Sequence, residues 1–301
     1  TALSDCDVAR MAQVTESGIT PDAIVHLCYP FGDVTGGAGF VDIALGPLWA
    51  AMPDVERRVD ISMTGVDGHG QAWLGQAGHY AGGFAAPFLG IPPTGRLAHL
   101  RFHEFYRIIN NLAVEVQAIW DLPDLMLQAG VWPMGPPLGH SGRVPGPMTQ
   151  DGLRIGGNGS HALRVVGDML DRLHLSPQGE AAMDLPAAWH PRCTWYGPGG
   201  IGTARGIRGF RDHHQIPFLN AMPDRRGLIE RGHFFAQGDY VAFTAWPGME
   251  MHVTGDGWLG IAPSGQKITM RSLDFWRVEG DLHDHSHGNR RCERHQFQGR
   301  H

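Results

Sequence analysis

The sequence lacks the features that would place it with membrane proteins or nucleic-acid-binding proteins. No apolar stretch is long enough to span a bilayer. The formal net charge is −6, from 24 Lys and Arg against 30 Asp and Glu, whereas binding to phosphate-rich surfaces requires a basic face. The segment Thr1–Asp7 has neither a basic start nor an apolar run, so we expect no signal peptide and a cytoplasmic location.

Cysteines and phosphate-loop motifs are also scarce. The four cysteines lie far apart and form no Cys-x-x-Cys pair (Cys6, Cys28, Cys193 and Cys292), which is typical of reduced thiols in a cytoplasmic protein. The Gly-rich stretch at 199–202 lacks both the Gly-x-Gly-x-x-Gly spacing and a following Lys-Ser or Lys-Thr, so we interpret it as a turn. Glycine (43) and proline (21) are abundant instead, which favours short elements joined by turns over a helical bundle.

The chain contains an internal repeat. The octapeptide PLWAAMPD at 47–54 recurs as PFLNAMPD at 217–224, and FLGIPPTG at 88–95 recurs as WLGIAPSG at 258–265. The distance from position 47 to position 217 equals that from position 88 to position 258, and we call it the repeat offset. One offset shared by two separate motifs indicates two copies of one domain.

The repeat predicts a first domain at residues 1–131 and a second at 160–301, joined by a Gly/Pro-rich connector at 132–159. Each copy is expected to open with a helix capped by serine, at Ser4 and at Ser160. Alternating residues then predict strands at 61–66, 100–108, 240–245 and 270–278, with turns at 67–68 and 238–239. Helices followed by antiparallel strands indicate an α+β domain, with helices covering one face of a curved sheet.

A set of short motifs in the first copy carries a resemblance to a known family. The motifs are AMPD at 51–54, GHY at 78–80, LGIPPTGR at 89–96, EFYRI at 104–108, Glu115, DLPDLM at 121–126 and QAG at 128–130. In this order and spacing they resemble the SnoaL-like polyketide cyclase (ester cyclase) family of the nuclear-transport-factor-2-like (NTF2-like) superfamily. The resemblance covers nearly the whole chain as two tandem units.

This resemblance implies two tandem cone-shaped α+β barrels, each a strongly curved, mostly antiparallel sheet covered by helices around an apolar pocket. It also implies catalysis without a metal or organic cofactor, in which a pocket carboxylate closes a ring by intramolecular aldol condensation. The superfamily includes isomerases, dehydratases, epoxide hydrolases and non-catalytic binding domains, so the fold alone does not decide the function.

Asp121 and His79 are the first two catalytic candidates. Asp121 occupies the position of the family's catalytic aspartate, and burial beside Trp120 would raise its pKa toward that of a general base. The alternative is that Asp121 caps the helix that begins near Pro123. His79 is positioned to donate a hydrogen bond to a substrate carbonyl or to shuttle a proton, and a purely structural histidine is the alternative.

Glu104 is the third catalytic candidate. It follows His103 on one strand, so the two side chains point to opposite faces and only one of them faces the pocket. The second copy has Ser272 and Asp274 at these positions, so an acid is retained where Glu104 stands. That retention fits either a shared pocket group or a shared surface ion pair.

A set of aromatic and histidine side chains would suit the wall of a pocket for a flat, apolar, oxygen-bearing molecule. For each of them, ordinary packing in the core is the alternative. The expected pocket residues are Trp49, Trp73, Phe84, Phe88, His103, Tyr106 and Trp120.

The second copy departs from the pattern after Leu282. At the repeat offset, Arg291 stands where Asp121 is expected, and the stretch 283–301 has almost no apolar periodicity. Three interpretations remain open: a disordered tail, a shifted reading frame or sequence error, or a metal site formed by His283, His285 and His287 with Cys292.

The prediction for function is a cofactor-independent acid–base enzyme that acts on an apolar carbonyl compound, as a polyketide-type aldol cyclase. The alternatives are a hydrolase or isomerase that uses the same pocket, and a non-catalytic protein that binds small molecules. The expected partner is a small apolar carbonyl compound, with no metal, nucleic acid or membrane. The two domains are expected to pack as an intrachain pseudo-dimer, unless the chain forms a homo-oligomer.

Overall fold

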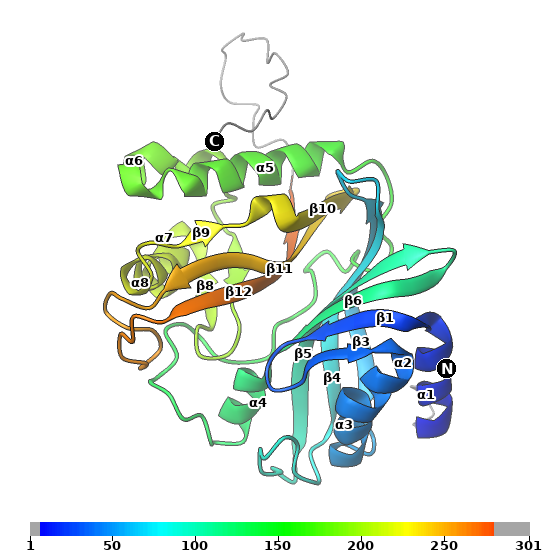
Figure 1. Cartoon of the computed structure of the whole chain (residues 1–301). Helices are drawn as coiled ribbons and strands as arrows, with labels where there is room; N and C mark the ends of the chain where they lie inside the picture. The colour runs from blue at the N-terminus through cyan, green and yellow to red at the C-terminus, as the bar shows by residue number, and fades with distance from the viewer. Residues whose placement is uncertain (1–6, 280–301) are drawn as a thin grey trace.

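The computed structural model describes residues 7–279, which form two sheets with helices packed against them (Figure 1). The first half contains α1 (Val8–Gly18), β1 (Ile19–Leu27), β2 (Gly32–Thr35), α2 (Gly36–Phe40), the π-helical η1 (Val41–Leu45), α3 (Gly46–Ala51), β3 (Glu56–Val66), β4 (Ala72–Gly83), β5 (Leu97–Ile109), β6 (Leu112–Trp120) and α4 (Leu122–Gln128).

The first sheet has the strand order β2-β1-β6-β5-β4-β3. Neighbouring strands are antiparallel except β1 and β6, which are parallel. The α+β class and the mostly antiparallel sheet are therefore confirmed, but the expected barrel is not closed, because β2 and β3 remain at opposite ends of the sheet. Helices α1, α2 and α3 pack together on one face of this open sheet (Figure 1).

The second half contains α5 (Ser160–His174), η2 (Ser176–Gln178), α6 (Glu180–Met183), η3 (Leu185–Ala187), β7 (Thr194–Tyr196), β8 (Thr203–Arg205), α7 (Gly206–Phe210), η4 (Arg211–Gln215), α8 (Ile216–Ala221), β9 (Arg226–Gly227), η5 (Ile229–Arg231), β10 (Gly232–Gln237), β11 (Tyr240–His252) and β12 (Lys267–Arg277). Its main sheet has the order β10-β11-β12, with β9 beside β11, and β7 and β8 form a separate pair. The stretch after Leu282, where the sequence departs from the repeated pattern, lies outside the described residues.

The repeat offset recurs in the structure. The run α2-η1-α3 at 36–51 corresponds, residue for residue at that offset, to the run α7-η4-α8 at 206–221. The LGI turn also recurs, with φ of 50° at Leu89 and 53° at Leu259, each followed by a glycine with positive φ. Both turns are closed by a β-bridge, Phe88 to Ile91 in one and Trp258 to Ile261 in the other.

The residues that cap α1 and α5 are not the two serines that the sequence predicted. Asp7, rather than Ser4, caps α1, because its carboxylate accepts the Arg10 backbone N–H. Ser160 is the first residue of α5 rather than its cap, and Asn158 Oδ1 accepts the Ser160 N–H instead. Within residues 7–279, no helix is both long and apolar enough to cross a membrane.

The two sheets pack face to face around a shared apolar cluster. Its buried members come from β3, β4 and β5 of the first half and from β10, β11 and β12 of the second: Met63, Trp73, Phe105, Phe235, Tyr240, Ala242 and Leu273. Glycine allows this close approach, because a Cβ at Gly65 would lie 2.9 Å from Phe235 Cβ. The halves therefore share part of one core.

The connector at 132–159 has no helix or strand but is bonded to both halves. Ser62 of β3 donates its backbone N–H to Gly152 O, and Gly135 N donates to Leu259 O. Isolated bridges join His140 to Thr203 and Asn158 to Gln237. These bonds fix the connector along the junction between the two sheets.

Candidate functional site

An apolar cavity of about 380 Å³ lies between α1 and the concave face of the first sheet. Its wall is formed by Arg10, Met11, Val14, Thr15, Ile19, Phe40, Leu45, Trp49, Arg57, Tyr80 and Tyr106. The volume is within the range of small-molecule sites, and the wall is apolar apart from a few polar groups. Helix α1 covers one side, although only Met11 of this helix is buried.

A buried carboxylate organises the polar end of this cavity. Glu104 is fully buried and accepts four hydrogen bonds. Its Oε1 accepts the Tyr80 hydroxyl at 2.9 Å and Trp120 Nε1 at 3.0 Å. Its Oε2 accepts Arg57 Nη2 at 2.6 Å and the Tyr106 hydroxyl at 2.7 Å. Burial alone would raise the pKa of Glu104, but the Arg57 charge and these donors lower it below its ordinary value.

This network fits an electrostatic role for Glu104 better than proton abstraction. Four donors saturate its two oxygens, and the lowered pKa makes the carboxylate a weak base. The Tyr80 and Tyr106 hydroxyls are used as donors to Glu104, so each presents an acceptor oxygen. Burial and the Glu104 charge raise the pKa of both tyrosines, which therefore stay protonated.

Trp49 supplies an unused donor in the cavity wall. The side chain is 5% exposed, and its buried Nε1 has no hydrogen-bond partner within residues 7–279. A buried N–H without a partner carries a desolvation cost that a ligand acceptor would offset. The Arg57 cation makes this wall suited to an oxygen acceptor, and the Trp49 N–H would become a second donor if the ring shifted toward the ligand.

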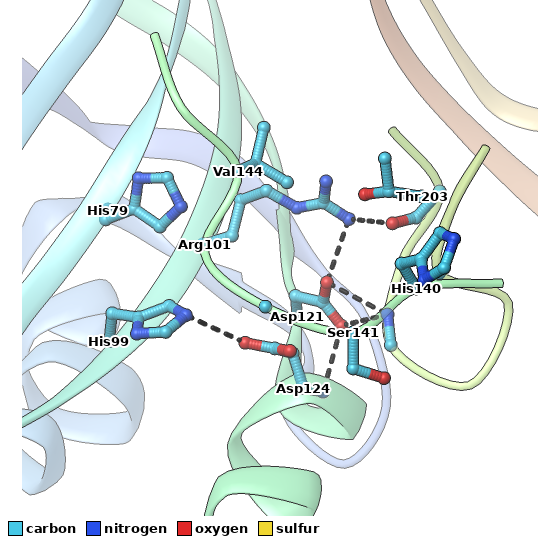
Figure 2. A pocket seen from close by; sticks show the side chains of 13 residues that line it. His79, His99, Arg101, Asp121, Asp124, His140, Ser141, Val144 and Thr203 are labelled. Carbon is cyan, nitrogen blue, oxygen red and sulfur yellow. Dashed lines mark hydrogen bonds and ion pairs between the residues drawn. The ribbon is translucent and has the colours of Figure 1, made fainter. Parts of the chain in front are cut away.

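A second, polar crevice lies at the junction of the first half, the connector and the loop at 197–203 (Figure 2). Its lining residues are His79, His99, Arg101, Asp121, Asp124, His140, Ser141, Gly142, Val144, Gly197, Gly199, Gly202 and Thr203. Its interior volume is about 10 Å³. That is the space of about one water molecule, so the closed crevice has no room for an apolar substrate.

Asp121 is 6% exposed and its carboxylate is occupied by protein donors (Figure 2). Oδ2 accepts Arg101 Nη2 at 2.8 Å, and Oδ1 accepts the backbone N–H of Gly199 at 2.9 Å and of Asp124 at 3.2 Å. Asp121 therefore caps α4, as the alternative interpretation predicted, and also joins the two halves. Burial raises its pKa, and Arg101 and the Gly199 N–H oppose that rise only in part.

His79 lies on the crevice side of the first sheet because it precedes Tyr80, which faces the cavity. It is 2% exposed, and its Nδ1 lies 3.2 Å from Asp60 Oδ2. Its buried Nε2 has no hydrogen-bond partner among the described residues. His99 packs against it with ring centroids 5.6 Å apart, and His99 Nε2 lies 3.2 Å from Asp124 Oδ2.

The predicted site residues lie in four separate places in the structure. Asp121 and His79 meet in the crevice, on the opposite side of the sheet from the cavity. Trp49 and Tyr106 line the cavity, and Glu104 and Trp120 form the hydrogen-bond network at its polar end. Phe84 and Phe88 are buried in the core of the first half and are not part of this wall.

Trp73 and His103 are corrections to the predicted pocket, because both face the second half. Trp73 Nε1 donates to Asp67 Oδ2, and the ring belongs to the shared cluster. His103 Nδ1 lies 2.6 Å from Leu273 O, which requires the neutral ring to donate there. Burial, aided by the Arg101 charge, lowers the pKa of His103 to about 4. As expected from strand alternation, His103 and Glu104 point to opposite faces.

Sequence reasoning missed Arg57 and Arg10, and it noted Tyr80 only as part of a motif. Tyr80 and Glu104 stand at strand positions whose side chains point to the face that forms the cavity wall. The alternation of side chains along each strand was therefore a partial signal for them. Arg57 reaches Glu104 from 47 residues earlier in the chain, and no local pattern predicts that pair. Arg10 lies on the exposed helix α1, where a charged residue is ordinary.

The second half does not repeat the polar network. At the repeat offset, Gly227, Glu250 and Trp276 stand where Arg57, Tyr80 and Tyr106 stand in the first half.

Asp274, the counterpart of Glu104, makes no hydrogen bond or ion pair within the described residues. Burial raises its pKa to about 6.

No group of three or more His, Cys, Asp and Glu side chains in the described part of the chain is arranged to hold a metal ion. The predicted alternative of a metal site at His283, His285, His287 and Cys292 lies outside the described residues.

Residues 178–283 match the family model of the SnoaL-like domain. This SnoaL-like match ends beside Leu282, where the sequence departs from the repeated pattern. Among curated proteins, none matches the chain significantly.

The solved structures that are similar to part of this chain include three that each cover less than half of it. A protein of Jannaschia sp. described as a SnoaL-like polyketide cyclase has 18% identity and a TM-score of 0.35, covering 44% of this chain and 87% of that one. IdmH of Streptomyces antibioticus has 23% identity and a TM-score of 0.35, covering 43% and 91%. A SnoaL-like polyketide cyclase of Agrobacterium tumefaciens has 17% identity and a TM-score of 0.33, covering 42% and 88%.

Proposed function

We propose that the first half binds a small, apolar, carbonyl-bearing molecule in the cavity between α1 and the first sheet. The observation that carries this proposal is the 380 Å³ apolar cavity with the Glu104 network at one end. The body of the ligand packs against the apolar wall. Its carbonyl oxygen faces the Arg57 cation and the unpartnered Trp49 N–H.

The charge state of the network supports polarisation of that carbonyl. Burial alone would lower the pKa of Arg57, but Glu104 beside it raises that pKa well above its ordinary value, so Arg57 remains a cation. Glu104 is held by four donors and therefore keeps Arg57 in place without competing for the ligand proton. No Asp, Glu or His is among the described residues that line this cavity, so its wall supplies binding and polarisation but no general base.

We propose further that the chain is two SnoaL-like domains in tandem, packed as an intrachain pseudo-dimer. The recurrence of helices and turns at one offset and the apolar cluster between the sheets support this arrangement. The second domain then serves mainly to cover the outer face of the first, because its counterparts of Arg57, Tyr80 and Tyr106 are different residues.

Trp49→Phe tests the binding proposal. The variant keeps a six-membered aromatic ring but removes the pyrrole part of the indole with its unpartnered N–H, so affinity for an aromatic ketone such as 2-acetylnaphthalene is expected to fall by at least about three- to tenfold, the value of one neutral hydrogen bond. Isothermal titration calorimetry measures the change. Trp195→Phe, in the second half, is the matched control and should leave affinity unchanged. Equal affinities of all three proteins for the ketone would refute the assigned role of Trp49.

A second candidate is acid–base catalysis at the crevice, with Asp121 as base and His79 as its partner. The raised pKa of Asp121 and the position of both residues on one crevice favour it. Such chemistry requires the crevice to open, because its closed volume of about 10 Å³ is water-sized.

Asp121→Asn separates the two candidates. In the binding account the variant loses about 1–3 kcal/mol of stability, because Arg101 loses its charge partner, while ketone affinity at the cavity stays within about twofold. In the catalytic account turnover of a carbonyl substrate is lost although the variant is folded. Denaturant unfolding, calorimetry and product analysis by mass spectrometry, run on the same preparations, distinguish these outcomes.

A further inference from the structure

The cavity of the first half carries a positive charge that no described protein group balances. Arg57 is paired with Glu104 at 2.6 Å, so this pair is close to neutral as a unit. Arg10, on α1, also lines the cavity but makes no ion pair within residues 7–279. Its backbone N–H is used in the α1 cap, whereas its guanidinium is left without an acidic partner in that range.

The rest of the wall has no group that would repel an anion by charge. The described residues that line the cavity include two arginines and no Asp or Glu. The remaining donors and acceptors are neutral: the Trp49 N–H, two tyrosine hydroxyls that stay protonated, and Thr15, whose hydroxyl donates to Met11 O. The wall therefore has an excess of one positive charge, located at the α1 side of an otherwise apolar space.

Resting on the proposed function, we infer that the ligand of this cavity is an apolar organic acid, whose carboxylate binds Arg10 on the α1 side. The planar guanidinium matches a carboxylate with two parallel hydrogen bonds. A single unbalanced cation suits a monoanion, whereas a phosphate dianion would leave a net negative charge against apolar side chains. The apolar body fills the space toward Trp49 and Tyr106, and the carbonyl of the proposed ligand lies at its far end, beside Arg57.

Three probes with one ring system test this inference: 2-naphthoic acid, 2-naphthamide and 2-naphthyl phosphate. Their affinities for the full chain are measured by isothermal titration calorimetry at about 20 mM and about 500 mM NaCl, since screening weakens an exposed ion pair. We expect the acid to bind about three- to tenfold more tightly than the amide at low salt. We expect Arg10→Gln to abolish that preference without changing amide affinity. Arg208→Gln, at a residue 94% exposed on α7, controls for net charge.

The possible outcomes distinguish a failure of this inference from a failure of the binding proposal on which it rests. If acid and amide bind equally and Arg10→Gln changes neither, the acid specificity is refuted while the cavity remains a binding site. If the phosphate binds more tightly than the acid, the carboxylate assignment is refuted. If none of the three probes binds, the proposed function fails together with this inference. Thermal unfolding of Arg10→Gln should match the parent protein, because the side chain is exposed.

Discussion

Replacing Glu104 with glutamine is expected to lower the free energy of unfolding by about 3–5 kcal/mol, because it leaves the Arg57 cation buried without its charge partner. Glu104 is fully buried, and all four of its donors are side chains from the first half. Glutamine has one acceptor oxygen and an N–H₂ group, so at least one of these donors would face another donor. Urea unfolding monitored by circular dichroism measures the loss.

Two further variants test whether that loss of stability comes from breaking the buried charge pair. Glu56→Gln breaks an ion pair on the surface, in which the Arg58 side chain is 57% exposed and the Glu56 side chain 51%. This variant should change the free energy of unfolding by no more than about 0.5 kcal/mol. The double variant Arg57→Met with Glu104→Gln should recover part of the loss, since both members of the charge pair are then removed. A loss below about 1 kcal/mol for Glu104→Gln alone would contradict the buried network.

The pH dependence of this effect follows from the lowered pKa of Glu104. A carboxyl whose pKa is lower in the folded state contributes stability above its unfolded pKa, and this contribution is lost as the pH falls through the folded pKa. The stability difference between the parent protein and Glu104→Gln should therefore be constant near neutral pH. It should shrink only in acid, below the ordinary glutamate value of 4.5.

Replacing Phe235 with alanine is expected to cost about 3–5 kcal/mol as well, because it empties the centre of the contact between the two sheets. Phe235 is 1% exposed, and its ring centroid lies 5.8 Å from that of Phe105. Gly65 and Gly75 leave the space that this ring occupies, since a Cβ at Gly75 would lie 3.1 Å from Phe235 Cζ. The loss would be measured as a lower midpoint of urea unfolding.

The control for Phe235 is Ile229→Ala in the same half, where the side chain is 53% exposed and a change within about 0.5 kcal/mol is expected. Because the halves share a core, the parent protein should unfold in one transition. Two well-separated transitions in the parent, with Phe235→Ala affecting neither midpoint, would show that the contact between the sheets contributes little.

The fold was largely predictable because its signals are local. Alternating residues marked the strands, and the repeat offset recurs in the structure. The closure of the barrel was not predictable, since it depends on whether β2 and β3 meet at the far ends of the sheet.

The site was harder to predict because it depends on which face each strand presents. His79 and Tyr80 are neighbours, so only one of them faces the cavity, and the motif that contains both does not say which. The capping role of Asp121 was predictable from the following Pro123, yet its other partners come from elsewhere: Arg101 from the adjacent strand and Gly199 from 78 residues further along the chain. No spacing within one half of the chain predicts a contact with the other half.

A crystal structure of the protein with 2-naphthoic acid would test the central claim most directly, which is that the ligand site is the cavity of the first half. We predict electron density for the ring beside Trp49 and Tyr106, with the carboxylate directed to Arg10. Density for the ring in an opened crevice beside Asp121 and His79, with the cavity empty, would contradict that claim and support the catalytic alternative.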